Sequence, residues 1–338
     1  MNMNQPFFSI LILLWQSEQY LQTCLHSLQA QTFKDFEVIL LDNGASHPPD
    51  PAILEVFHDL DLKHLHSDAN LGFAGGNNLA AKSATGEYLV LLNSDAFPDP
   101  DWLATFHQAA LAHPGHCFTS RLLQAGNSAI LDGEWNVYHA SGLAWRKNHS
   151  QPATKSATGP RYVMSACAAA SAYPRTAFEQ VGGFDEEFFA YMEDIDLDMR
   201  LQLAGYPFLY LPDAVVQHVG SGSTGYRSDF ATYYGQRNLI WAFIKNMPGF
   251  LFYLLLPAHI FYNLIYVIAG FFMPSGKALF RGKKDALKGL STMRKKRNAI
   301  QSQRKITPLQ FARLLDWNPF SPVVKILVHD ASTKDHND

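Results

Sequence analysis

The chain has 338 residues, of which 47% are hydrophobic and 17% are charged, and its formal net charge is −3. This composition excludes an intrinsically disordered chain, and the length fits one large domain with an appendage or two modest domains. Eleven Lys and Arg but only one acid, Asp285, fall between Lys277 and Lys305, which leaves the rest of the chain acidic. An acidic body suits metal binding, and the basic section suits anionic lipid or another polyanion.

The cysteines and the start of the chain indicate a cytosolic compartment. Cys24, Cys117 and Cys167 are far apart and form no metal-binding pair, which is typical of a reduced environment. The apolar run from Phe7 to Trp15 is short and leads directly into a helical pattern. We interpret it as a buried strand, not as a signal peptide.

The first hundred residues alternate between strand and helix patterns. Apolar strands are predicted over 7–14, 36–42, 62–66 and 87–92, and helices over 18–30, 51–59 and 72–84. This alternation predicts an α/β fold, with a mainly parallel sheet flanked by helices. Asp42 and Asp95 lie at the carboxyl ends of two of the strands, and ligands bind beyond such ends.

The remainder of the body is less regular. Between 117 and 173 we expect short strand-like pieces and a loop near 150–160, and the region from Cys167 to Tyr173 is expected to form the sugar pocket. Helices are predicted over 174–181, 193–204 and 226–246, and a pair of strands over 208–218, around Pro212.

A long apolar segment follows, from Phe250 to Met273, without a charged residue. Its length fits a membrane-spanning helix, but Pro257 and His259 also fit a re-entrant or interface-lying hairpin, and a buried core helix is the third alternative. The basic stretch after it favours membrane contact on the cytoplasmic side. We therefore divide the chain into a catalytic domain (1–246), an apolar membrane-associated or transmembrane helix (247–276) and a basic amphipathic region (277–338).

Polar residues at strand and helix ends are the candidate site residues. Asp42-Asn43 can contact a base or ribose, or form a turn. The glycine-rich stretch with Gly72, Gly75 and Asn77 can approach a nucleotide or phosphate, or reflect tight packing alone. Asn93 and Asp95 end a strand, where an Asp can hold Mg²⁺ or Mn²⁺ on a diphosphate, or form an Asx turn.

An acidic helix start and a histidine complete the set. Acids at a helix start can simply complement the helix dipole, but those near Glu193 and Asp194 alternate with apolar residues and cannot all face water. Their repulsion raises carboxyl pKa values, which suits a general base or a metal neighbour. His218 ends an apolar strand and is either structural or a metal ligand beside Asp95.

Together these motifs resemble those of an inverting family 2 glycosyltransferase of the rhamnosyltransferase-like bacterial group. The resemblance implies the GT-A fold, in which a mixed, Rossmann-like sheet is flanked by helices. The resemblance runs from Phe8 to Trp241 and rests on NLGFAGGNN, LLNSDAFPDPDWL, GGFDEEFFAYMEDIDLDMRLQLAGY and PDAVVQH. It implies a nucleotide-diphosphate sugar as donor and a divalent cation, Mg²⁺ or Mn²⁺. It also implies transfer to a hydroxyl of a glycan or lipid-linked acceptor in cell-surface polysaccharide synthesis. The apolar segment and the basic stretch favour a lipid-linked acceptor and the cytoplasmic face of the plasma membrane.

The resemblance also implies residue roles. Asp194 would be the general base, supported by Glu193, and Asp95 and His218 would hold the metal. The remaining positions would contact the donor: Asp42, Asn43, Gly72, Gly75, Asn77, Asn93 and Arg237. Three positions depart from the family pattern, namely Trp15-Gln16 after the first strand, His47 after the second, and Asn93 at the start of the metal motif. The alternatives are a nucleotidyltransferase and a degenerate protein that binds a sugar nucleotide or acts as a scaffold; a nucleic-acid partner is not expected.

Overall fold

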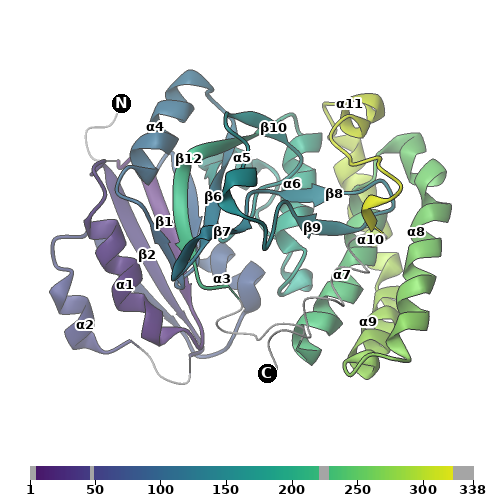
Figure 1. Cartoon of the computed structure of the whole chain (residues 1–338), viewed down its shortest axis with the longest axis horizontal. Helices are drawn as coiled ribbons and strands as arrows, with labels where there is room; N and C mark the ends of the chain where they lie inside the picture. The colour runs from purple at the N-terminus through teal and green to yellow at the C-terminus, as the bar shows by residue number, and fades with distance from the viewer. Residues whose placement is uncertain (1–4, 46–48, 221–227, 323–338) are drawn as a thin grey trace.

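A computed structural model describes residues 5–45, 49–220 and 228–322. His47, one of the positions that depart from the family pattern, lies outside the described residues, as does the end of the basic region. Figure 1 shows a sheet-containing body with a group of helices against one end of it.

The first half of the sheet follows the predicted alternation. Its strands β1 (Phe8–Leu14), β2 (Phe36–Asn43), β3 (Leu62–Ser67) and β4 (Tyr88–Leu92) pair in parallel, in the order β4-β1-β2-β3. Helices α1 (Glu18–Gln29), α2 (Pro51–Val56) and α3 (Gly72–Ala81) connect them. The carboxyl ends of β1, β2 and β4 therefore meet at one edge of the sheet, as the sequence predicts.

The second half of the sheet is mixed. Antiparallel β11 (Ala170–Pro174) joins β4 to β6 (Cys117–Gln124), and β12 (Phe208–His218) runs parallel to β6. The edges are formed by β5 (Ala96–Pro98), β7 (Asn127–Gly133) and β10 (Arg161–Val163), while β8 (Asn136–Tyr138) and β9 (Ala144–Arg146) make a separate hairpin. Helices α4 (Trp102–Ala112), α5 (Arg175–Gln180) and α6 (Glu193–Leu203) complete the body. The α/β class with a mixed sheet flanked by helices is confirmed.

The prediction of two strands around Pro212 is wrong. Residues 208–218 form one strand, β12, whose register against β6 shifts between Leu211 and Val215. The shift absorbs Pro212 without ending the strand, because a bulge accommodates a residue that cannot donate to the ladder. As a result His218, at the far end of β12, reaches the same edge of the sheet as β4.

The C-terminal helices are α7 (Asp229–Asn246), α8 (Gly249–Gly270), α9 (Gly276–Lys288), α10 (Leu290–Ser302) and α11 (Pro308–Ala312). They share one apolar core with α6, built from residues such as Phe188, Met199, Trp241, Met293 and Phe311. Among the described residues, α8 is the one helix that is long and apolar enough to cross a membrane. Only 17% of its most apolar window is buried, so α8 is not a buried core helix.

Candidate active site

An open cavity of about 310 Å³ lies where β1, β2 and β4 end and α6 begins. It brings together most of the predicted site residues from distant parts of the sequence. The predicted residues that line it are Asn43, Gly72, Asn93, Asp95, Glu193, Asp194 and His218. Three residues of the expected sugar pocket, Cys167, Ala168 and Ala169, line it as well.

His218 is held between two carboxylates. Its Nε2 lies 3.3 Å from Asp95 Oδ1, and its Nδ1 lies 2.7 Å from Asp132 Oδ2. Burial lowers the pKa of His218, but the two carboxylates outweigh burial and raise the pKa to about 9. Asn93 Nδ2 lies 3.3 Å from the same Nε2 atom, so the side chains that end β4 and β12 converge on one point.

Asp132 was not predicted from the sequence. It lies on β7 and accepts hydrogen bonds from both His218 and Arg146, and Arg146 in turn lines the cavity. Burial raises the pKa of Asp132, but Arg146 and His218 outweigh burial and hold that pKa well below its usual range. No local motif marks Asp132, since its partner His218 is 86 positions away in the sequence.

The donor atoms of Asp95 and His218 suit a divalent cation. Two ligand atoms that bind one cation at ~2.1 Å and at right angles lie ~3.0 Å apart, close to the 3.3 Å between Asp95 Oδ1 and His218 Nε2. The contact of Asp132 with the other ring nitrogen is the arrangement found behind metal-binding histidines. Within the described ranges no group of three or more His, Cys, Asp or Glu side chains could hold a metal. A cation at Asp95 and His218 would therefore need further ligands, such as phosphate oxygens.

Asp194 opens into the cavity at the start of α6. Its carboxylate accepts hydrogen bonds from Asn136 Nδ2, at 2.8 Å, and from the Ile195 amide, at 2.7 Å. Burial raises the pKa of Asp194 despite these contacts, and burial together with Asp194 raises the pKa of Glu193 well above its usual value. Among the described residues, Glu193 Oε2 is buried without a hydrogen-bond partner. The start of α6 thus presents two carboxyl groups that hold protons more tightly than usual.

The loop before α6 has a strained backbone. Phe189, Tyr191 and Met192 all have positive φ, at 65°, 63° and 68°. Such a conformation costs about 1–3 kcal/mol for each residue other than glycine, and it persists only when neighbours hold it. The same loop, residues 189–192, lines the cavity beside Asp194.

Two side chains of α7 hold this loop from behind. Asn238 Nδ2 lies 2.8, 2.9 and 2.7 Å from the carbonyl oxygens of Phe188, Ala190 and Tyr191. Arg237 donates to the Phe188 carbonyl at 3.0 Å and stacks over Trp241. Arg237 therefore lies behind the cavity wall and does not line the cavity, and its predicted contact with the donor stays a prediction.

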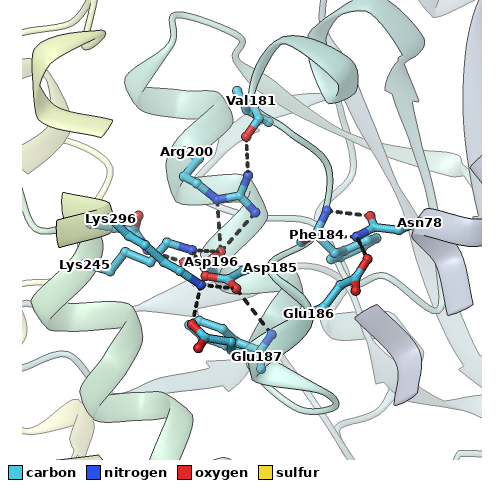
Figure 2. A network of polar contacts seen from close by, with 12 residues as sticks. Asn78, Val181, Phe184, Asp185, Glu186, Glu187, Asp196, Arg200, Lys245 and Lys296 are labelled. Carbon is cyan, nitrogen blue, oxygen red and sulfur yellow. Dashed lines mark hydrogen bonds and ion pairs between the residues drawn. The ribbon is translucent and has the colours of Figure 1, made fainter. Parts of the chain in front are cut away.

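A buried network of charges supports the same region (Figure 2). Lys245 of α7 contacts Asp185 Oδ2 at 2.5 Å and Asp196 Oδ2 at 2.8 Å, and Lys296 of α10 contacts Asp185 Oδ1 at 2.6 Å. Arg200 binds the same Asp196 carboxylate at 3.0 Å. Because Asp196 lies two residues after Asp194 in α6, the network ties the start of α6 to the C-terminal helices.

Only some of the residues predicted to contact the nucleotide line the cavity. Asn43 Oδ1 accepts from the Leu71 amide at 3.0 Å, which fixes the loop that begins α3. Asp42 lies behind the cavity wall, where it contacts His66 Nδ1 at 2.9 Å and the Ala45 amide at 2.9 Å. Its role toward a nucleotide stays a prediction.

The glycine-rich start of α3 is tightly packed. Gly72 has φ +70°, and a Cβ there would lie 2.4 Å from the Phe189 carbonyl oxygen. A Cβ on Gly75 would meet Leu71 at 3.1 Å, and Asn77 donates to the Phe73 carbonyl at 2.9 Å. Close packing accounts for these positions, and only Gly72 of the three lines the cavity.

Comparison with solved structures identifies the fold. The fold is shared with GT-A glycosyltransferases of known structure. GalNAc-T7, solved with UDP, GalNAc and Mn²⁺, superposes with a TM-score of 0.65 over 97% of this chain and 58% of that one, at 16% identity. TarS from S. aureus, solved with UDP-GlcNAc, gives 0.56 over 97% and 88%, at 15% identity. Such low identity shows the fold alone.

The sequence comparison then gives the family. The model of Glycosyl transferase family 2 matches residues 9–182, and the chain belongs to this family of glycosyltransferases. The O-antigen biosynthesis protein RfbC of Myxococcus xanthus is 32% identical over an alignment of 217 residues, which covers 59% of this chain but only 16% of that protein. The N-acetylglucosaminyl-diphospho-decaprenol L-rhamnosyltransferase of Mycobacterium tuberculosis is 28% identical over 235 residues, covering 61% of this chain and 74% of that one.

Proposed function

We propose that this glycosyltransferase moves a sugar from a nucleotide-diphosphate donor to an acceptor hydroxyl, with inversion at the anomeric carbon. The observation that carries the proposal is that Asp194 opens into the same cavity as Asp95 and His218. A base and a candidate cation site within one cavity suit a single displacement, in which the hydroxyl attacks opposite the departing diphosphate. The family favours this function over the nucleotidyltransferase and the non-catalytic alternatives.

Asp194 is the proposed general base. Its raised pKa brings it nearer to the working pH, and a proton transfer by a positioned side chain typically contributes about a hundred- to ten-thousand-fold in rate. Asn136 and the Ile195 amide orient the Asp194 carboxylate. The positive charge of Arg146 favours the ionised form of this carboxylate and so opposes the rise in its pKa. Glu193 supports Asp194 or contacts the acceptor.

Asp95 and His218 are the proposed ligands of Mg²⁺ or Mn²⁺, with Asn93 beside them. When bound, the cation supplies Lewis-acid stabilisation of the diphosphate charge. The chain's own part is to keep the Asp95 carboxylate and His218 Nε2 at a separation that one cation can bridge. We place the nucleotide near Asn43 and Gly72, with Asp42, Gly75, Asn77 and Arg237 as further donor contacts to be tested.

The named relatives support a proposal for the sugar and the acceptor. One of them is an L-rhamnosyltransferase that acts on a lipid-diphosphate-linked sugar by name, and another is an O-antigen biosynthesis protein. We propose transfer of rhamnose or another hexose to a glycan or lipid-linked acceptor in cell-surface polysaccharide synthesis. The reaction would take place at the cytoplasmic face of the plasma membrane.

A donor screen followed by one substitution tests this proposal. Thermal shift with a panel of sugar nucleotides and Mn²⁺ identifies the donor, and transfer is then measured for Asp194→Asn. We expect that variant to lose nearly all transfer and to keep the thermal shift. Asp213→Asn, an exposed acid on β12, serves as the control. Near-normal turnover by Asp194→Asn would remove Asp194 as the base.

A further inference from the structure

The outer side of α8 is an exposed apolar surface. Phe272, which follows the helix, is 86% exposed, and Tyr253 within it is 75% exposed. We call this surface the α8 face; it comprises Phe250, Tyr253, Leu254, Ile260, Phe261, Leu264, Ile268, Phe271 and Phe272, each at least 50% exposed. In Figure 1, α8 lies at the end of the molecule opposite α1 and α2. An apolar surface of this extent marks an interaction site.

The opposite side of α8 is fixed to the body. His259 Nδ1 contacts the Ser141 carbonyl oxygen at 2.8 Å, and its ring stacks on Phe243 with 4.0 Å between centroids. Lys283 of α9 donates to Asn263 Oδ1 and, at 3.2 Å, to the Gln236 carbonyl of α7. These polar contacts join the middle of α8 to the body of the protein. Hydrocarbon could therefore surround the helix only if the contacts broke and left their polar groups unpaired.

The neighbouring helix α9 carries a stripe of positive charge. Lys277, Arg281, Lys284 and Lys288 are spaced four, three and four residues apart, which places them on one side of the helix, and all are exposed. Since α9 packs against α8, a spanning α8 would carry these charges toward the bilayer centre, where charge is strongly disfavoured. At the bilayer surface the same charges meet anionic headgroups.

We propose that α8 lies flat in the surface of an anionic phospholipid bilayer and does not cross it. The α8 face enters the boundary between headgroups and acyl chains, and the α9 stripe contacts the headgroups. The two features together are those of an interfacial helix, namely an apolar face beside Lys and Arg. This inference takes only the location at a membrane from the proposed function. Its test uses no sugar nucleotide.

Vesicle flotation tests whether an anionic bilayer binds the α8 face. We expect the full chain to float with vesicles of phosphatidylcholine and phosphatidylglycerol and to float much less with phosphatidylcholine alone. Leu264→Ser with Phe272→Ser should weaken binding at least about tenfold, because each removes an apolar side chain from the lipid contact. Lys277→Gln with Lys284→Gln should weaken binding to the anionic vesicles about tenfold or more and lower its salt dependence.

Matched controls separate the proposal from folding defects. Leu111→Ser changes an exposed leucine on α4, and Lys82→Gln with Lys155→Gln removes two exposed charges elsewhere; both should float like the parent chain. Asp194→Asn should float normally, so that failure of transfer and failure of docking are told apart. Equal flotation of the α8-face variant, or a lipid-free dimer that this variant disrupts, would overturn the proposal.

Alkaline extraction tests the geometry. Membranes that carry the full chain should release it into the supernatant at high pH, as expected for a helix in one leaflet. Retention in the membrane pellet, as for a spanning helix, would overturn the flat placement.

Discussion

His218 Nδ1 donates a hydrogen bond to Asp132 Oδ2 across 2.7 Å. The two residues come from β12 and β7, which both pair with β6. The contact fixes the plane of the imidazole ring and aims Nε2 at Asp95. Asp132 itself is held by Arg146, which lines the cavity. We infer that Asp132 is a positioning residue for the proposed cation site.

Replacing Asp132 by Asn should therefore weaken cation binding. Loss of such a partner typically reduces metal affinity about ten- to a hundred-fold, so the Mn²⁺ concentration for half-maximal transfer should rise by that factor. Calorimetric titration of Mn²⁺ in the presence of the donor gives the same quantity without turnover. Asp61→Asn, at an exposed position before β3, is the control. An unchanged Mn²⁺ affinity in Asp132→Asn would contradict the positioning role.

Removal of the cation should stop transfer. Because Asp95 and His218 supply only two donor atoms, the cation is expected to exchange readily and to be stripped by EDTA. Transfer should fall to background after chelation and return when Mn²⁺ or Mg²⁺ is added in excess. Full activity in EDTA would mean that His218 and Asp95 form only an ion pair.

The hold of Asn238 on the strained loop should be needed for turnover. Asn238→Asp keeps the size of the side chain but replaces the amide donor by an acceptor, which faces the carbonyls of Phe188, Ala190 and Tyr191. We expect the free energy of unfolding to fall by about 1–3 kcal/mol and kcat to fall at least tenfold, because the loop beside Asp194 relaxes. Asn298→Asp, exposed on α10, is the control for both urea unfolding and kinetics. A variant that loses stability but keeps kcat would show that the loop geometry is not catalytic.

The sequence predicts the strands that bear the site because β2, β4 and β12 are largely apolar and end at or next to polar residues. The sequence pattern places Asp95 and His218 at strand ends and Asp194 at the start of a helix. In the structure all three residues line one cavity. The bulge in β12 was missed because Pro212 normally ends a strand, and nothing local shows that the ladder resumes at Val215.

The supporting residues could not be predicted in the same way. Asp132 contacts a histidine 86 residues away, and Lys245 reaches Asp185 60 residues away. Neither pair leaves a spacing signal, because each depends on how β7 and α7 pack in three dimensions. The same holds for α8: its sequence carries no charge, and the contacts of His259 and Asn263 with the body identify its inner side only in the folded structure.

The network around Asp185 predicts an acid-sensitive step in stability. Burial raises the pKa of Asp185, but Lys245 and Lys296 outweigh burial and lower the pKa to about 2, from 3.8 in the unfolded chain. A carboxyl group with a lowered pKa in the folded state contributes stability above about pH 4, and the contribution is lost as the pH falls toward about 2. The shift corresponds to roughly 2 kcal/mol. Burial lowers the pKa of Lys245, so the ionisation of this lysine adds no comparable contribution to the free energy of unfolding.

Urea unfolding at a series of pH values measures this step. The parent chain should lose roughly 2 kcal/mol more than Asp185→Asn between about pH 5 and about pH 2, because the variant has no carboxyl group to protonate there. Asp185→Asn should also be less stable than the parent at neutral pH, since it leaves Lys245 and Lys296 with fewer partners while both remain in place. Glu55→Gln, an exposed acid on α2, should follow the parent's pH profile. Parallel profiles for the parent and Asp185→Asn would contradict the link between this carboxylate and the C-terminal helices.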